Sequence, residues 1–273
     1  MITIGVDPVA FSIGDVAIRW YGIMMALAII VLVLWAVWQV RRGAAITYDN
    51  LIMLALVAIP SGIIFSRLLH VIDEWEFYGQ NPSQIIGTEG LTIFGAIVGA
   101  TLAIWVYTRF ARLRFGYIMD VAAPGIVLAQ AIGRVGCTLN GCCYGGETDI
   151  WCAVTYTDPD SAAPLGVSVH PTQVYEIIFL LLAFIPLFFL RRRLKPDGSL
   201  FMVYLSLYSI WRLVIGFLRD GESFLFGLQQ AQVLAIAVLA VTLPLLIYRT
   251  RWVKKGEEDA MKETETWRGS SQE

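Results

Sequence analysis

The sequence predicts an all-α, polytopic membrane protein of about seven transmembrane helices, with its N-terminus outside and its C-terminus in the cytoplasm. Of its 273 residues, 57% are hydrophobic and only 15% are charged. The mean hydropathy is +0.66, and a water-soluble domain could not bury that much apolar surface. The net charge of -2 provides no overall field for nucleic acid, so we expect no nucleic-acid partner.

Seven segments are long and apolar enough to cross a bilayer core, which requires roughly 20 mostly apolar residues in a helix. Two of them carry no charge, a third is nearly as clear, and the other four tolerate a polar residue near one end. In chain order they cover residues 20–40, 51–72, 90–108, 117–137, 171–190, 199–218 and 224–248.

The loops between these segments alternate in charge. Clusters of arginine or lysine follow the first, third, fifth and last segments, and the intervening loops are acidic or mixed. By the positive-inside rule the basic loops are cytoplasmic. We therefore expect one transmembrane helical domain over residues 1–252, followed by a short, charged and disordered cytoplasmic tail over residues 253–273. The N-terminus lacks the basic region of a cleavable signal peptide.

Several costly polar residues fall toward the outer leaflet in this orientation. An arginine in the middle of a membrane helix costs about 2.5 to 3.5 kcal/mol, so such residues usually have a partner or a function. Arg134 ends the fourth segment, Glu176 opens the fifth, and Arg212 lies between apolar residues of the sixth. Guanidinium groups bind phosphate bidentately and neutralise a phosphate leaving group. The cluster therefore predicts chemistry on a phospholipid at the outer leaflet.

Simpler interpretations exist for individual residues. Arg19 and Arg219 fit arginines that extend toward lipid headgroups. For Arg212, the main structural alternative is an ion pair with Glu176. Glu176 can also hold an arginine in place or accept a proton.

Three polar stretches stand out, at residues 133–145 (GRVGCTLNGCCYG), 170–176 (HPTQVYE) and 208–212 (YSIWR). The glycines of the first permit tight turns and close backbone approach. In the second, Pro171 can begin a helix that directs His170, Gln173 and Glu176 toward one cavity. Arg219 follows Arg212 by seven residues and would share its helical face.

The four cysteines do not predict a metal site. Cys142 and Cys143 are adjacent, with Cys137 and Cys152 nearby, but no histidine pair accompanies them. We expect packing residues or a structural disulfide rather than a catalytic thiol, because no neighbouring base is evident.

Together with Arg19-Trp20-Tyr21-Gly22, these stretches resemble the prolipoprotein diacylglyceryl transferase family over about residues 15–250. The resemblance implies transfer of the diacylglyceryl group of phosphatidylglycerol to the lipobox cysteine thiol of a preprolipoprotein, with release of glycerol phosphate. It places this reaction at the outer face of the bacterial inner membrane, and we expect no cofactor and no metal.

The resemblance, taken with the polar residues above, gives two sets of candidate residues. In the working mechanism, Arg134 and Arg212 hold the phosphate while the peptide thiolate attacks the glyceryl carbon, and Glu176 or His170 accepts the proton. The candidate catalytic residues are Arg134, Arg212, Glu176 and His170. The candidate substrate-binding residues are Tyr21, Arg67, Asn140, Gln173, Tyr175 and Arg219.

Three positions differ from the family motifs. Phe94 replaces a histidine, Cys137 an asparagine and Gly216 a glutamate. Phe94 and Gly216 favour the main alternative, a paralogue that binds or moves a lipid or a small anionic solute without catalysis. A third hypothesis, a thiol-redox membrane protein built on Cys142 and Cys143, explains none of the arginines.

Overall fold

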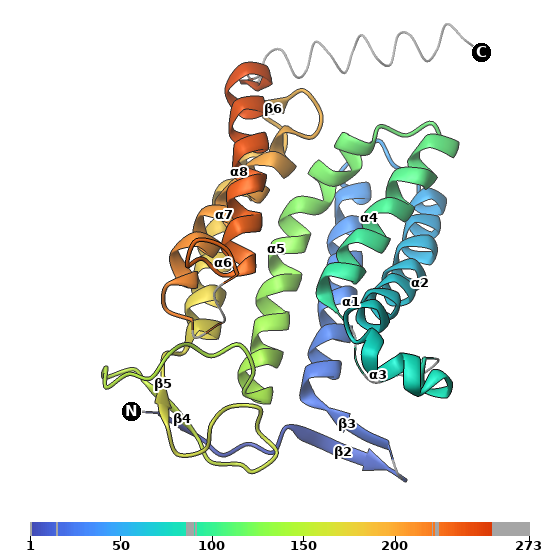
Figure 1. Ribbon diagram of the computed structural model, residues 1–273. Helices are drawn as coiled ribbons and strands as arrows, with labels where there is room; N and C mark the ends of the chain where they lie inside the picture. The colour runs from blue at the N-terminus through green and yellow to red at the C-terminus, as the bar shows by residue number, and fades with distance from the viewer. Residues whose placement is uncertain are drawn as a thin grey trace, which may run out of the picture. The chain divides into compact units, whose positions relative to one another are not determined.

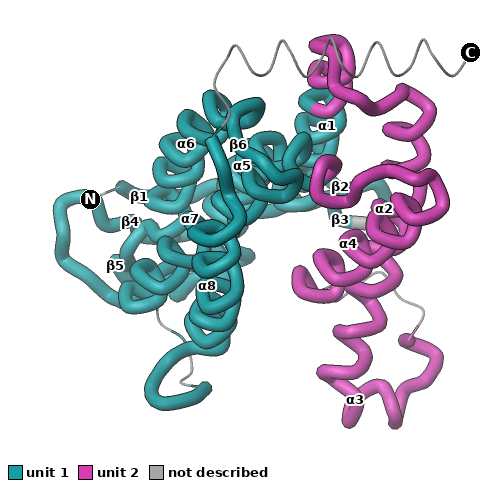
Figure 2. Tube along the Cα trace, turned by 90° about the horizontal axis from the view of Figure 1, so that it is seen from above, with its two compact units in different colours: residues 1–35, 119–273 teal, residues 36–118 magenta. Residues whose placement is uncertain are grey.

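The computed structural model describes residues 2–14, 16–85, 90, 92–219, 221 and 224–252. Within these ranges it contains seven helices long and apolar enough to span a membrane, which confirms the predicted fold class. The chain forms two compact units, unit 1 with residues 1–35 and 119–273 and unit 2 with residues 36–118 (Figure 2). The orientation of the termini and the single domain stay predictions, and the predicted tail lies outside the described residues.

The long helices match the seven predicted segments (Figure 1). They are α1 (Trp20–Arg41), α2 (Tyr48–Asp73), α4 (Ile93–Phe110), α5 (Phe115–Asn140), α6 (Thr172–Leu190), α7 (Ser199–Gly216) and α8 (Gln230–Arg249). The largest difference is at α8, which begins six residues later than its apolar run. Gln229 and Gln232 form a reciprocal capping box that fixes this start. The short helices α3 (Trp75–Gln80) and η1 (Pro82–Gln84) were not predicted.

The core of unit 1 lies between α5, α6 and α7. Ala123 and Val127 of α5 pack with Leu180 and Leu187 of α6, and all four are almost fully buried. At the opposite end from the polar stretches, the Asp120 carboxylate of α5 accepts hydrogen bonds from the backbone N–H groups of Gly198 (2.7 Å) and Phe201 (2.8 Å). Asp120 therefore caps the N-terminus of α7, where an anion is favoured by the helix dipole.

Short strands join the N-terminus to the long loop between α5 and α6. They were not predicted. β1 (Ile2–Ile4) pairs in parallel with β4 (Val154–Tyr156), which pairs antiparallel with β5 (Ser168–Val169). The remaining strands form two antiparallel pairs, β2 (Val9–Ile13) with β3 (Val16–Arg19) and β6 (Leu194–Lys195) with β7 (Arg251–Trp252). The three-stranded sheet, in the order β1-β4-β5, gives this loop a small folded substructure.

In unit 2, α2 and α4 approach closely through glycines. A Cβ atom at Gly95 would lie 2.3 Å from the Phe65 carbonyl oxygen, and one at Gly99 would lie 2.6 Å from the Ser61 carbonyl oxygen. The Ser61 hydroxyl donates to the Gly99 carbonyl at 3.0 Å. Small residues four apart let membrane helices pack backbone to backbone, and this pair follows that pattern.

Candidate functional site

Arg134 and Glu176 form the centre of the candidate site in unit 1. Arg134 lies in α5 and Glu176 in the first turns of α6, and Arg134 Nη2 is 2.9 Å from Glu176 Oε1. The Glu176 side chain is only 3% exposed. The Tyr208 hydroxyl of α7 donates to the same carboxylate oxygen at 3.1 Å. Three helices thus fix one carboxylate, whose charge is balanced by Arg134 rather than by water.

Arg212 has a hydrogen-bonding group without a partner. Its Nη1 is buried and has no hydrogen-bond partner among the residues that the structure describes. The carboxylate of Glu176 is paired with Arg134, so the Arg212–Glu176 ion pair considered as a structural alternative is not formed. A buried guanidinium N–H without a partner costs free energy comparable to a lost hydrogen bond. Arg212 is therefore available to an anionic ligand.

Arg219 contributes to the site from outside the helix that was expected to carry it. Helix α7 ends at Gly216, so the prediction that Arg212 and Arg219 share a helical face is wrong. A turn after Gly216 brings Arg219 Nη2 to 3.3 Å from the Cys143 carbonyl oxygen, to which it donates. Arg219 thus lies against the loop that follows α5.

The loop after α5 is held by the first residues of α6. The Gln173 amide donates to the Cys142 carbonyl at 2.8 Å, and the Thr172 hydroxyl donates to the Cys143 carbonyl at 2.6 Å. Gln173 is 2% exposed, and its amide also approaches the Tyr156 hydroxyl at 3.5 Å. Burial raises the pKa of Tyr156 to about 12, so its hydroxyl stays protonated and donates to the Thr138 carbonyl. In this structure Gln173 positions a loop.

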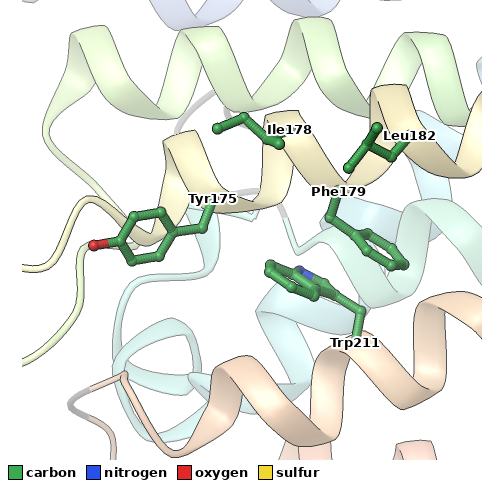
Figure 3. Close-up of a pocket in the computed structure, with 5 residues that line it drawn as sticks. All are labelled: Tyr175, Ile178, Phe179, Leu182 and Trp211. Carbon is green, nitrogen blue, oxygen red and sulfur yellow. The ribbon is translucent and has the colours of Figure 1, made fainter.

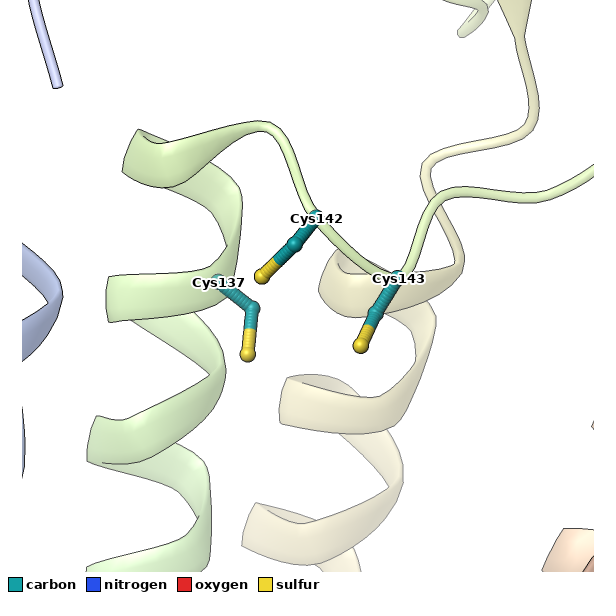
Figure 4. Close-up of side chains that lie close together, drawn as sticks. All are labelled: Cys137, Cys142 and Cys143. Carbon is teal, nitrogen blue, oxygen red and sulfur yellow. The ribbon is translucent and has the colours of Figure 1, made fainter. Parts of the chain in front are cut away.

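Three cysteines gather where α5 meets the loop that follows it (Figure 4). The sulfur atoms of Cys137, Cys142 and Cys143 all lie within 4.8 Å of one another, and Arg134 Nη1 donates to Cys137 Sγ at 3.8 Å. Hydrogen bonds with the thiols of Cys137 and Cys142, together with the guanidinium groups of Arg219 and Arg134, lower the pKa of Cys143. All four cysteines are free thiols, so the structural disulfide considered from the sequence is not formed.

His170 and Asn140 are half-buried, and each has one buried polar atom that is unused. His170 Nδ1 and Asn140 Oδ1 have no hydrogen-bond partner among the described residues. The His170 ring lies 6.3 Å from the Tyr175 ring, just before α6. Their catalytic and substrate-binding roles stay predictions, but both retain the capacity to bind a ligand.

Tyr175 lines an apolar groove between α6 and α7 with a volume of about 300 Å³ (Figure 3). The rest of the lining consists of Ile178, Phe179, Leu182 and Trp211, and the Phe179 and Trp211 rings stack at 4.5 Å. Tyr21, at the start of α1, lies against α5, since a Cβ atom at Gly136 would be 3.4 Å from Tyr21 Cα.

Arg67 belongs to unit 2, where backbone carbonyls surround its guanidinium group. It donates to the carbonyl oxygens of Ile85 (2.9 Å), Gly90 (3.1 Å) and Gln84. It also lies 5.0 Å from the centre of the Tyr78 ring. These contacts give Arg67 a structural function in unit 2, and its substrate-binding role stays a prediction.

Comparison with known proteins identifies the family. Residues 8–248 match the profile of the prolipoprotein diacylglyceryl transferase family. The chain belongs to this family. The phosphatidylglycerol–prolipoprotein diacylglyceryl transferase of Dehalococcoides mccartyi is 56% identical over 95% of this chain and 100% of its own length. Proteins of the same name from Clostridioides difficile (38% identity; 84% of this chain and 90% of the relative) and Listeria monocytogenes (33%; 89% and 90%) are also similar.

The chain differs from the family motifs at three positions. At two of them, Gly216 and Cys137, the structure shows what surrounds the replacing residue. Gly216 packs against Gln232 of α8, and a Cβ atom at Gly216 would lie 2.6 Å from the Gln232 side chain, so a glutamate here would require Gln232 to move. Cys137 belongs to the cysteine cluster. Phe94, in α4, is 41% exposed, and its replacement of a histidine has no structural explanation.

The cysteine cluster was not predicted from the sequence. Its signal was the spacing Cys137-x₄-Cys142-Cys143 with Gly141 between them. Gly141 has a φ of 71°, and the chain reverses there so that the Cys142 N–H donates to the Cys137 carbonyl at 3.1 Å. Helix C-termini often end on a glycine in this left-handed conformation. The reversal brings together thiols that lie up to six residues apart in the sequence.

Proposed function

We propose that this chain transfers the diacylglyceryl group of phosphatidylglycerol to the lipobox cysteine thiol of a preprolipoprotein, releasing glycerol phosphate. Family membership supports the reaction class. The reaction is assigned to the outer leaflet of the bacterial inner membrane on the strength of the predicted orientation, in a protein with seven membrane-spanning helices. The substrates follow from the names of the relatives.

One observation supports the proposal most directly, the buried Arg212 guanidinium beside the Arg134–Glu176 pair. Three guanidinium groups, of Arg134, Arg212 and Arg219, and one carboxylate, Glu176, make up the charged groups of this cluster, which leaves two positive charges. The Arg212 side chain interacts electrostatically with all three of these neighbours. An excess positive charge in a water-poor site favours a phosphate, and it stabilises the charge that develops on a phosphate leaving group.

The position of each residue indicates its function in this reaction. Arg212 Nη1 donates to a phosphate oxygen, and Arg134 is held beside it by Glu176 and Tyr208. The apolar groove between α6 and α7 is lined by Tyr175, which precedes Glu176 in the sequence, and it offers a path for an acyl chain of the lipid. The thiolate attacks the glyceryl carbon, the C–S bond forms, and the C–O bond to phosphate breaks.

Complementation tests this function. The chain is expressed in a bacterium depleted of its own transferase, and diacylglyceryl modification of a prolipoprotein is measured by mass spectrometry. We expect rescue by the wild-type chain, loss of rescue by Arg212→Ala, and partial rescue by Arg212→Lys, which keeps the charge but not the planar donors. Arg41→Ala, an exposed arginine at the end of α1, is the matched control and should rescue fully.

The paralogue without catalysis makes the opposite prediction. A chain that only binds or moves a lipid would reach the membrane at normal levels and leave the prolipoprotein unmodified. Lipid bound to the purified protein, without modification of the prolipoprotein, would establish that alternative.

A further inference from the structure

The cysteine cluster of Cys137, Cys142 and Cys143 has the geometry of a metal-ligand set. Zinc binds thiolate sulfur at about 2.3 Å, so tetrahedral ligation places the sulfurs about 3.8 Å apart. The three sulfurs already lie within 4.8 Å of one another. No pair of these sulfurs therefore needs to approach by more than about 1 Å. Figure 4 shows the three side chains extending into the same space between α5 and the loop.

The surrounding structure fixes the backbone that presents these thiols. Cys137 lies in the last turns of α5, and Thr172 and Gln173 of α6 hold the carbonyls of Cys143 and Cys142. Cys143 has a φ of 65°, in the left-handed region that disfavours residues with a Cβ atom. A glycine would relieve this strain, yet the chain has a thiol there. Strained residues held by their neighbours in this way are typical of functional positions.

The charges near the cluster suit a metal bound by three thiolates. Three thiolates and a divalent ion have one net negative charge. Arg134 Nη1 lies 3.8 Å from Cys137 Sγ, and the guanidinium group of Arg219 contacts the Cys143 carbonyl. Arg134 is already paired with Glu176, so Arg219 is the cation that balances the bound ion and its ligands, and Arg212 stays available to the phosphate. The group supplies three ligands among the described residues, so a tetrahedral ion keeps one open position.

We propose that Cys137, Cys142 and Cys143 bind a thiophilic divalent ion of the Zn²⁺ class, and that its open position takes the cysteine thiol of the acceptor protein. This inference rests on the proposed function, because it assigns the activation of that thiol. On coordination the substrate S–H bond breaks and its proton passes to solvent. The thiolate forms the C–S bond with the glyceryl carbon, and the electron pair of the broken C–O bond leaves with glycerol phosphate beside Arg134.

This inference differs from the expectation drawn from the sequence, which assigned no metal because no histidine pair accompanies the cysteines. It gives the cluster a function that neither packing nor a disulfide supplies. A thiol with an ordinary pKa of about 8.5 is mostly protonated near neutral pH. A metal ligand overcomes that limit, because a coordinating thiol is deprotonated outright.

Metal binding is tested on the purified full-length protein, reduced and stripped of metal with a chelator. We expect a single equivalent of Co²⁺ to produce the thiolate-to-cobalt charge-transfer band in the near ultraviolet and the intense visible bands of tetrahedral cobalt. Zn²⁺ should displace it. A lipobox peptide with cysteine should shift the visible bands, and the same peptide with serine should not.

The matched variants are Cys142→Ser and Cys143→Ser, with Cys152→Ser as the control outside the cluster. The first two should weaken Zn²⁺ binding by more than the 10- to 100-fold typical of changes that only surround a metal site. Cys152→Ser should bind as the wild type does. Size-exclusion chromatography establishes that each variant is folded, and the chelated wild-type chain gives a second comparison that needs no substitution.

The outcomes separate this inference from the proposed function. Absence of stoichiometric metal binding by the reduced wild-type chain, or equal binding by Cys142→Ser, overturns the metal site. Full transfer by the chelated chain overturns the activation of the thiol while the transferase function stands. Metal binding without any transfer keeps the site and removes the transferase function.

Discussion

Arg134 and Arg67 both lie toward the ends of long apolar helices, but the two units treat them differently. In unit 2, the Arg67 guanidinium donates to three backbone carbonyls and lies over the Tyr78 ring. In unit 1, Arg134 faces the Glu176 carboxylate and a thiol. An arginine that binds carbonyls fixes the backbone, whereas one that shares a polar cluster with Glu176 and Arg212 can meet an incoming anion.

The most severe test of this comparison is Arg134→Ala. It leaves the Glu176 carboxylate buried without its partner, which costs about 3 to 5 kcal/mol. It also removes a charge beside the leaving group, so we expect transfer to fall by at least about 100-fold. Thermal unfolding in detergent and a prolipoprotein modification assay measure the two effects. Transfer at the wild-type rate would remove Arg134 from the mechanism.

The double variant Arg134→Met/Glu176→Gln separates stability from chemistry. It removes both charges and keeps an acceptor for the Tyr208 hydroxyl, so the free energy of unfolding should return most of the way to that of the wild type. Transfer should stay as low as in Arg134→Ala. Recovery of both properties would mean that the ion pair serves only the fold.

Arg67→Ala tests the other side of the comparison. Loss of its hydrogen bonds to the carbonyls of Gln84, Ile85 and Gly90 should lower the free energy of unfolding by about 3 kcal/mol, since charged donors contribute the most. Transfer per folded molecule should fall by less than about tenfold. A stable variant with transfer reduced as far as in Arg134→Ala would place Arg67 in the substrate site instead.

The fold was largely predictable because each membrane-spanning helix leaves a long apolar run in the sequence. The exceptions follow from capping and pairing. Helix α8 begins at Gln230 because Gln229 and Gln232 cap it, although its apolar run starts earlier. β1 and β4 consist of three residues each, and the pairing of segments about 150 residues apart leaves no local pattern.

The sequence predicted which residues form the candidate site, but it did not predict which of them contact one another. Arg134, Glu176 and Arg212 were predicted because a charged residue in a membrane helix has a high free-energy cost. The structure brings the first two together in an ion pair. Whether Arg134 or Arg212 pairs with the Glu176 carboxylate depends on how α5, α6 and α7 are rotated about their axes. The hydrophobic pattern of the sequence does not specify these rotations. The end of α7 at Gly216 moved Arg219 from a helical face to a turn. The reversal at Gly141 brought together three thiols that had predicted no metal site because no histidine pair accompanies them.

Gly99→Ala tests whether unit 2 is held by close backbone contact. The added methyl group would lie 2.6 Å from the Ser61 carbonyl oxygen and 2.5 Å from Phe65 Cβ, so α2 and α4 must separate. We expect a loss of about 2 kcal/mol from overpacking. Gly79→Ala, where the nearest atom is 3.9 Å away, is the control and should change stability by less than about 0.5 kcal/mol. Equal effects would contradict the close packing.

Tyr208→Phe is expected to have the smallest effect. It tests whether the Tyr208 hydroxyl positions Glu176 or binds the phosphate. It removes one hydrogen bond to Glu176 Oε1 and leaves the Arg134–Glu176 pair in place. The loss should be about 1 kcal/mol, because the carboxylate keeps its ionic partner. If Tyr208 only positions Glu176, transfer falls less than about tenfold and KM for the lipid is unchanged. A rise in KM alone would instead place the Tyr208 hydroxyl on the phosphate, with Arg212.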